Sequence, residues 1–214
     1  MGNIYYMQKK YVQANKQYRM ALDQIPNSSK EVRFKIFRNI GNSYVKMGQF
    51  QDAIQNFETI MNASPDFQTG FNLILCYYAL GDTDKMRRGF NKLLAIPVVG
   101  QEGDEDEEEE TKAVEEAEAV GQARVDGLRE ELKRLRKDAE HYIMTAARLI
   151  APSLDKTDWT KGYGWVHDAL KLDHDNLASA MSIDQGLQYL KNKDFEKAIE
   201  VRGRECREGG CRAT

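Results

Sequence analysis

Three cysteines and three histidines are the residues of this 214-residue chain best suited to metal binding or nucleophilic chemistry. They are Cys76, Cys206, Cys211, His141, His167 and His174. Zinc sites and disulfide frameworks place such residues at short, repeated spacings, and neither set has that pattern. Cys76 lies in an apolar run and is expected to be a small buried hydrophobe, while structural roles are expected for the histidines. The sequence therefore predicts no metal site and no cofactor.

Patterns typical of enzymes and nucleic-acid binders are also missing from the sequence. It has no glycine-rich phosphate loop, nucleophile elbow or metal signature, which predicts no catalytic residues and no small-molecule substrate. A formal net charge of −3 argues against a nucleic-acid partner, since such proteins carry a basic excess. Trp159, Tyr163 and Trp165 have no basic groove beside them and are expected to pack a helix. No apolar segment is long enough to cross a bilayer, so membrane insertion is not expected.

The dominant pattern is a unit of two helices, best defined from Phe34 to Phe67. Its pattern positions are Phe37, Ile40, Gly41, Tyr44, Gly48, Ala53, Phe57, Ile60 and Pro65. The apolar members of each helix fall on one face at spacings of three and four. Gly41 and Ala53 are small where the two helices must approach closely. Gly48 allows the left-handed turn between the helices, and Pro65 blocks continuation of the second.

The same order of residues recurs on both sides of this unit. Upstream, the matching residues are Gly2, Tyr5, Ala14, Tyr18, Ala21 and Pro26. Because that unit enters partway through its first helix, the chain is expected to be a fragment or a truncated form. A third unit contains Phe71, Ile74, Tyr78, Gly81, Met86, Phe90, Leu93 and Pro97. This unit fits the pattern only with one residue fewer at the turn, and Leu75 replaces the small residue.

A fourth unit near the end is damaged. Gly186, Tyr189 and Ala198 repeat the spacing, but Arg202 stands where an aromatic residue is expected. The order of small, aromatic and proline positions resembles the tetratricopeptide repeat family, whose helical hairpins are about 34 residues long. The resemblance implies an all-α tetratricopeptide-repeat solenoid, interrupted by an acidic loop and a long helix.

The chain is expected to divide into five segments. They are tetratricopeptide repeats over 1–98 with the first one incomplete, an acidic disordered loop over 99–120, a long heptad-patterned helix over 121–151, further helical hairpins including a partial repeat over 152–201, and a divergent disordered tail over 202–214. The loop contains the run GDEDEEEET, whose like charges repel and cannot pack. It lacks the spacing of an EF-hand, so a solvated loop is favoured over a calcium site.

The long helix carries an apolar seam that steps alternately by three and four residues. Its first members, Val125, Leu128, Leu132 and Leu135, predict a helix–helix interface. The seam is compatible with two arrangements: a helix packed on the neighbouring solenoid, or a coiled coil with another subunit.

One family of repeat proteins combines these features. Over roughly residues 1–201 the chain is similar to the tetratricopeptide-repeat subunits of intraflagellar transport complex B. The resemblance is carried by FRNIGNSYVKMGQFQDAIQNFETIM, GFNLILCYYALGD, the acidic insert, EHYIMTAARLIAP and YLKNKDFEKAIE. It implies a scaffold that binds other complex B subunits during cilium assembly, located at the cilium, the basal body and in the cytoplasm. After Val201 the chain departs from the family with RGRECREGGCRAT, which abandons the helical pattern.

Stacked hairpins form a superhelix whose concave face is lined by the first helices. A partner helix or extended segment is expected to bind there. The residues expected on this face are Lys35, Arg38, Asn42, Val45, Lys46, Thr69, Asn72 and Cys76. The alternative function is a chaperone-binding adaptor of the carboxylate-clamp kind, because Arg38 and Asn42 can both donate hydrogen bonds to a carboxylate.

Overall fold

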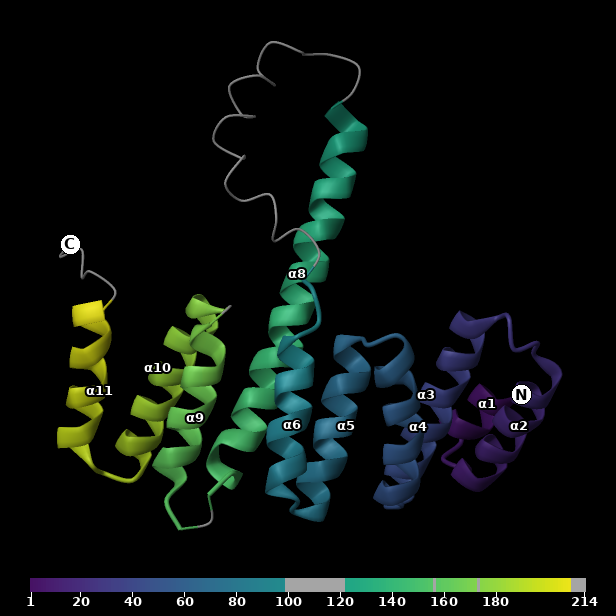
Figure 1. The fold of residues 1–214 in the computed structure, drawn as a ribbon, viewed down its shortest axis with the longest axis horizontal. Coiled ribbons are helices and arrows are strands. Elements are labelled where there is room, and N and C mark those ends of the chain that lie inside the picture. The colour runs from purple at the N-terminus through teal and green to yellow at the C-terminus, as the bar shows by residue number, and fades with distance from the viewer. Residues whose placement is uncertain (99–121, 156, 173, 209–214) are drawn as a thin grey trace.

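The computed structural model describes residues 1–98, 122–155, 157–172 and 174–208. Within these ranges every regular element is a helix, which confirms the predicted all-α fold (Figure 1). The elements are α1 (Gly2–Met7), α2 (Tyr11–Gln24), α3 (Lys30–Lys46), α4 (Phe50–Ala63), α5 (Phe67–Leu80), α6 (Thr83–Leu94), α8 (Gln122–Ile150), η2 (Ala151–Ser153), α9 (Trp159–Lys171), α10 (Asp175–Lys191) and α11 (Phe195–Glu208). The predicted acidic loop over 99–120 lies outside the described residues.

Four helical hairpins share one turn geometry. In each, a tyrosine carbonyl near the end of the first helix accepts a hydrogen bond from the amide that precedes the second helix. The pairs are Lys10 N to Tyr5 O at 2.9 Å, Gln49 N to Tyr44 O at 2.9 Å, Asp82 N to Tyr77 O at 3.1 Å and Asp194 N to Tyr189 O at 3.0 Å. The residue before each amide has a positive φ: Lys9, Gly48, Gly81 and Lys193. This left-handed turn ends the first helix and sends the chain back antiparallel.

The recurring turn corrects the predicted alignment of the third unit. Tyr77, not Tyr78, is the equivalent of Tyr44, and Tyr77 is 5% exposed whereas Tyr78 is 40% exposed. The missing residue therefore lies in the connection before α5 and not at the turn. As a result, Ile74 occupies the small position, and the small residue has moved to Gly89 on α6. A Cβ atom at Gly89 would lie 3.3 Å from Cγ1 of Ile74.

The small positions of the first two units accommodate an aromatic ring, as the sequence pattern predicts. A Cβ atom at Gly41 would lie 2.5 Å from Cε1 of Phe57, and one at Gly2 would lie 2.5 Å from Cε1 of Tyr18. Phe57 is fully buried and Tyr18 is almost so. In both hairpins the ring of the second helix packs directly on the backbone of the first.

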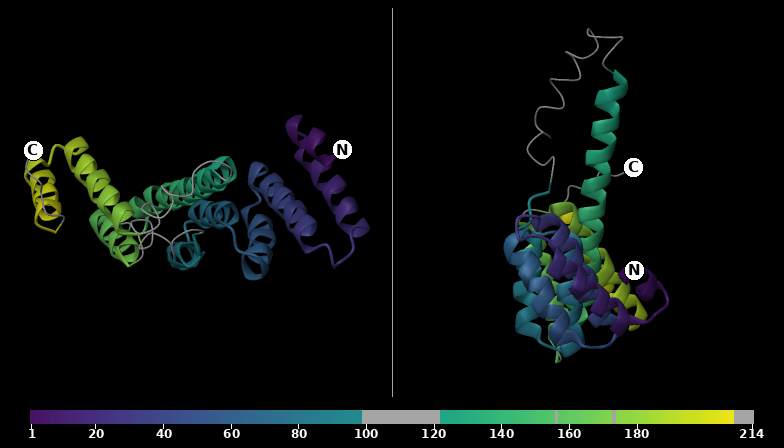
Figure 2. Two further views of the ribbon diagram at one scale, coloured as in Figure 1. Left: turned by 90° about the horizontal axis from the view of Figure 1, so that it is seen from above. Right: turned by 90° about the vertical axis from the view of Figure 1, so that its right-hand side faces the viewer.

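The long helix α8 belongs to the solenoid along only part of its length. Its C-terminal part contacts α5, α6 and α10, and Ala139, Ile143 and Ile150 are buried there. The helix ends before η2, which contains Pro152, and the chain then turns into α9. The N-terminal part of α8 extends beyond the ends of the neighbouring helices (Figures 1 and 2). The projecting part of α8 therefore separates consecutive hairpins along the sequence. The buried core nevertheless continues without a break from α4 to α10.

The expectation of a disordered tail from residue 202 is wrong for its first part. Helix α11 continues past Val201 to Glu208. The physical reason is composition: this stretch consists mostly of Arg and Glu, which have good helix propensity, and Gly203 is a single weak interruption. Two consecutive glycines follow at 209–210, where the described helix ends. Residues 209–214 lie outside the described part of the chain.

Candidate protein-binding surface

The expected binding face centres on Arg38 of α3, which the structure joins to the next hairpin. Nη2 of Arg38 donates to Oδ2 of Asp66 at 2.7 Å, and Nε donates to Oγ1 of Thr69 at 3.0 Å. Asp66 also caps α5, because its Oδ1 accepts the amide of Thr69 at 2.9 Å. The charge of Arg38 is therefore balanced within the chain, and α3 is held against the start of α5.

Two further polar contacts join successive first helices. Asn72 Nδ2 of α5 donates to Oδ1 of Asn42 of α3 at 3.1 Å, and Arg148 of α8 pairs with Asp184 of α10 at 2.6 Å. We use the term polar ladder for Arg38, Asp66, Asn42, Asn72, Arg148 and Asp184. Sequence reasoning missed Arg148 and Asp184, because these two residues lie far apart in the chain. Between these contacts, Phe71 of α5 meets the ring of Tyr142 of α8 with centroids 6.0 Å apart.

Two residues expected on the concave surface have no exposed area. Thr69 and Cys76 are both 0% exposed, so the expectation that they contact a partner is wrong. The error arises because the sequence pattern aligns α5 with α3 one residue out of register. The sequence alignment made Cys76 equivalent to Asn42, whereas the shared turn makes it equivalent to Ser43, which is also fully buried. The separate prediction that Cys76 is a buried hydrophobe is confirmed, and burial raises the pKa of its thiol to about 12.

The other residues of the expected face remain accessible to different degrees. Lys35 and Lys46 of α3 are exposed. Val45 is partly buried and packs against the main core. Tyr44 is also partly buried, and its hydroxyl accepts a hydrogen bond from Arg19 of α2. Of the α3 residues expected on this face, only the two lysines are exposed, and their contact with a partner stays a prediction.

The predicted helix–helix interface lies on the projecting part of α8. Leu132 is partly buried and Leu135 is 44% exposed, while the side chains of Val125 and Leu128 lie outside what the structure describes. None of the described residues from Gly127 to Asp138 is buried. Of the two predicted arrangements, packing on the solenoid applies to the C-terminal part of the helix. The described seam residues of the N-terminal part are not packed in the core.

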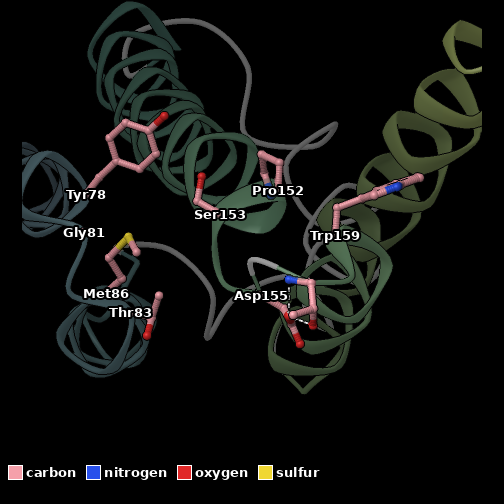
Figure 3. Close-up of a pocket in the computed structure, with 9 residues that line it drawn as sticks. Tyr78, Gly81, Thr83, Met86, Pro152, Ser153, Asp155 and Trp159 are labelled. Carbon is pink, nitrogen blue, oxygen red and sulfur yellow. Dashed lines mark hydrogen bonds between the residues drawn. The ribbon is translucent and has the colours of Figure 1, made fainter.

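A hollow of about 430 Å³ opens between the α5–α6 turn and the segment that follows α8. Tyr78 and Met86 line one side of it, and Asp155 and Trp159 line the other (Figure 3). The carboxylate of Asp155 accepts hydrogen bonds from the amide and the hydroxyl of Thr157, at 2.8 and 2.6 Å. These bonds hold the pKa of Asp155 down to about 2. Because this carboxylate is already bonded within its own loop, we assign the hollow no ligand.

The tryptophans pack helices together, as predicted. The ring of Trp159 lies 4.8 Å from that of Tyr189 of α10, and the ring of Trp165 lies 6.1 Å from that of Phe90 of α6. In the part of the chain that the structure describes, no group of three or more His, Cys, Asp or Glu side chains is placed to hold a metal ion. The described helices also include none that is long and apolar enough to span a membrane.

Comparison with known proteins agrees with the repeated helical hairpins seen in the structure. Residues 38–66 and 68–96 match the tetratricopeptide repeat family, and these segments cover most of the hairpins α3–α4 and α5–α6. The chain is 40% identical over 208 residues to the intraflagellar transport protein 88 homolog of Homo sapiens. The match covers 94% of this chain and 24% of that relative, so the chain spans about a quarter of the relative's length. The resemblance inferred from the sequence is confirmed.

Proposed function

We propose that this chain, a tetratricopeptide-repeat solenoid similar to the intraflagellar transport protein 88 homolog, is a protein-interaction scaffold of the intraflagellar transport machinery. Its partners are other subunits of complex B, which it binds during cilium assembly at the cilium and basal body. The main support is the 40% identity over 94% of the chain, since this similarity extends well beyond the two segments that match the repeat family. The proposed role is non-catalytic, and turnover of a substrate by the purified chain would contradict it.

The surface proposed to bind partners is the concave face formed by the first helices α3, α5, α8 and α10. The polar ladder supports this choice, because it joins α3 to α5 and α8 to α10, while the ring contact between Phe71 and Tyr142 connects α5 with α8. A face that is ordered before binding loses less conformational entropy when a partner segment docks. Lys35 and Lys46 add exposed positive charge at α3, which suits a partner with acidic residues.

The carboxylate-clamp alternative is less well supported. Arg38 already binds the carboxylate of Asp66, and the side chain of Asn42 accepts a hydrogen bond from Asn72. A ligand carboxylate would have to displace Asp66, which also caps α5. Breaking both interactions would cost stability, since a cap alone contributes about 1 kcal/mol. The guanidinium donors of Arg38 that such a clamp needs are therefore used to hold the solenoid together.

The proposal is tested by capture from ciliated-cell extract with the full 214-residue chain as bait. Complex B subunits are quantified by mass spectrometry. We expect their recovery to fall about tenfold, equivalent to about 1.4 kcal/mol, when Lys35→Glu and Lys46→Glu are combined.

The matched control combines Lys16→Glu and Lys92→Glu, which reverse two exposed lysines on the second helices α2 and α6. This control should leave recovery unchanged. Equal losses in both double variants would remove the concave face from the proposal. Recovery of chaperones without any complex B subunit would favour the clamp instead.

A further inference from the structure

The projecting part of α8 is an element whose role the solenoid does not explain. We define the arm as residues 122–138, the part of α8 in which no described side chain is buried. The N-terminal part of α8 extends past α5 and α6 in two perpendicular views (Figures 1 and 2). A helix of this length spans roughly 25 Å. Burial begins sharply at its inner end, where Ala139 is 2% exposed. Exposed apolar side chains on such an arm are available to another molecule.

The arm carries a leucine seam between two edges of opposite charge. Leu132 and Leu135 are in heptad register with Ala139, and Leu135 is 44% exposed. In this register Arg129 and Arg136 fall on one edge of the seam. Glu131 and Asp138 fall on the other edge.

The acidic edge is only weakly satisfied within the arm. Glu131 lies 3.4 Å from Arg134 one turn away, with both side chains about half exposed or more. An exposed pair of this kind contributes little to stability. Glu131 is therefore able to form an additional interaction with a basic group of a partner helix.

We propose that the arm binds an amphipathic helix of a different protein, with a leucine-type seam between one acidic edge and one basic edge. The acidic edge lies along Arg129 and Arg136, and the basic edge lies along Glu131 and Asp138. This inference rests on the proposed scaffold function and specifies the chemistry of one partner. Affinity comes from burial of the two seams, and the charged edges select the partner.

A second copy of this chain does not fit the arm. In a parallel pair the second α8 would follow the seam inward and take the place of α5, because Tyr142 on the same seam already meets Phe71. In an antiparallel pair each edge faces its own equivalent, so Arg129 would oppose Arg136 and Glu131 would oppose Asp138. Like charges in these positions are destabilising. Sterics exclude one arrangement and charge disfavours the other.

The inference is tested with designed helical peptides of about three heptads that carry leucine at both seam positions. One peptide has Glu on one edge and Lys on the other, a second has Lys on both edges, and a third has Glu on both. Binding of each labelled peptide to the full chain is measured by fluorescence anisotropy. We expect the mixed-edge peptide to bind at least about tenfold more tightly than either uniform peptide.

Two variants decide whether the arm is the site. Arg129→Glu combined with Arg136→Glu makes both edges acidic and should shift the preference to the peptide with Lys on both edges. Leu132→Ser combined with Leu135→Ser should abolish binding. Leu172→Ser is the matched control, because Leu172 is a leucine at the end of α9 that is 83% exposed, and it should change nothing. Circular dichroism of each variant confirms that the solenoid is folded.

Three results would overturn the inference. They are equal binding of the three peptides, binding that survives loss of both leucines, and self-association of the chain in sedimentation velocity that those leucine substitutions remove. The last result would identify a second copy as the occupant. Recovery of complex B subunits by the full chain together with failure of the peptides would reject the arm alone and leave the scaffold proposal intact.

Discussion

Gly41 and Gly186 occupy equivalent positions in their hairpins but meet different neighbours. The backbone at Gly41 lies against the ring of Phe57, whereas the nearest atom to a Cβ at Gly186, among the residues whose side chains the structure describes, is Cγ1 of Val201, at 4.0 Å. The residue equivalent to Phe57 in the last hairpin is Arg202. The close contact that calls for glycine at Gly41 is made by an aromatic ring, and the last hairpin has no aromatic residue at the equivalent position.

This contrast predicts opposite effects of the same substitution. Gly41→Ala should lower the free energy of unfolding by about 1–2 kcal/mol, because a Cβ 2.5 Å from a fully buried ring forces overpacking. Gly186→Ala should leave stability unchanged or raise it by up to about 1 kcal/mol, because alanine favours a helix and a Cβ there meets no described atom closer than 4.0 Å. Urea unfolding followed by circular dichroism measures both. A loss of stability in both variants would contradict the argument that the aromatic ring makes the difference between the two positions.

At the scale of elements, the joint between η2 and α9 leaves no space for a side chain at Gly162. A Cβ atom there would lie 1.9 Å from the carbonyl oxygen of Ala151, and backbone atoms cannot swing aside as a side chain can. Gly164, two positions further along the same helix, has no atom of the described residues within 4 Å of its Cβ position. Gly162 thus sets how closely α9 packs against the end of α8.

The two glycines of α9 provide a matched pair for testing this joint. Gly162→Ala should destabilise the chain by about 3 kcal/mol or more, since α9 must shift away from η2 and lose core packing. Gly164→Ala should be neutral or stabilising by up to about 1 kcal/mol through helix propensity. Thermal unfolding of the two variants side by side makes the comparison. Similar melting behaviour would mean that the close approach of α9 to Ala151 does not persist in solution.

At the scale of the whole molecule, burial is lower in the first and last described hairpins than in the hairpins between them. Phe195 and Ile199 of α11 are 61% and 72% exposed. Their equivalents in the second hairpin, Phe50 and Ile54, pack in the main core because α5 lies against α4. In a solenoid each hairpin gains stability from its neighbours, so a hairpin with one covered side is the least stable.

Hydrogen exchange should therefore follow the position of each helix in the solenoid. Amides of α4, α5 and α6 should exchange slowest, and those of α11 should exchange at least about tenfold faster than those of α4, because local opening requires less free energy. Exchange of the full chain, measured by mass spectrometry after peptic digestion, makes this comparison. Uniform protection from α4 to α11 would indicate a single cooperative unit and contradict the expectation.

Local patterns in the sequence were sufficient to predict much of this protein. The helical class, the repeated hairpins and the close approach of Gly41 to the second helix follow from residue types at short spacings. These features depend on contacts within one hairpin, where spacing along the chain determines which side chains meet. The similarity to intraflagellar transport proteins was also visible at this level, because whole segments of sequence carry it.

Other features depended on the tertiary structure. The residue pattern does not reveal that the connection before α5 is one residue shorter. The alignment of α5 with α3 therefore followed only from the shared turn geometry, and the burial of Thr69 and Cys76 only from the packed structure. The apolar seam of α8 continues without change from Leu135 to Ala139, yet burial begins between them because α5 and α6 end there. The polar ladder joins first helices of different hairpins. Burial and pairing of this kind depend on which neighbour packs against each helix, which local spacing does not encode.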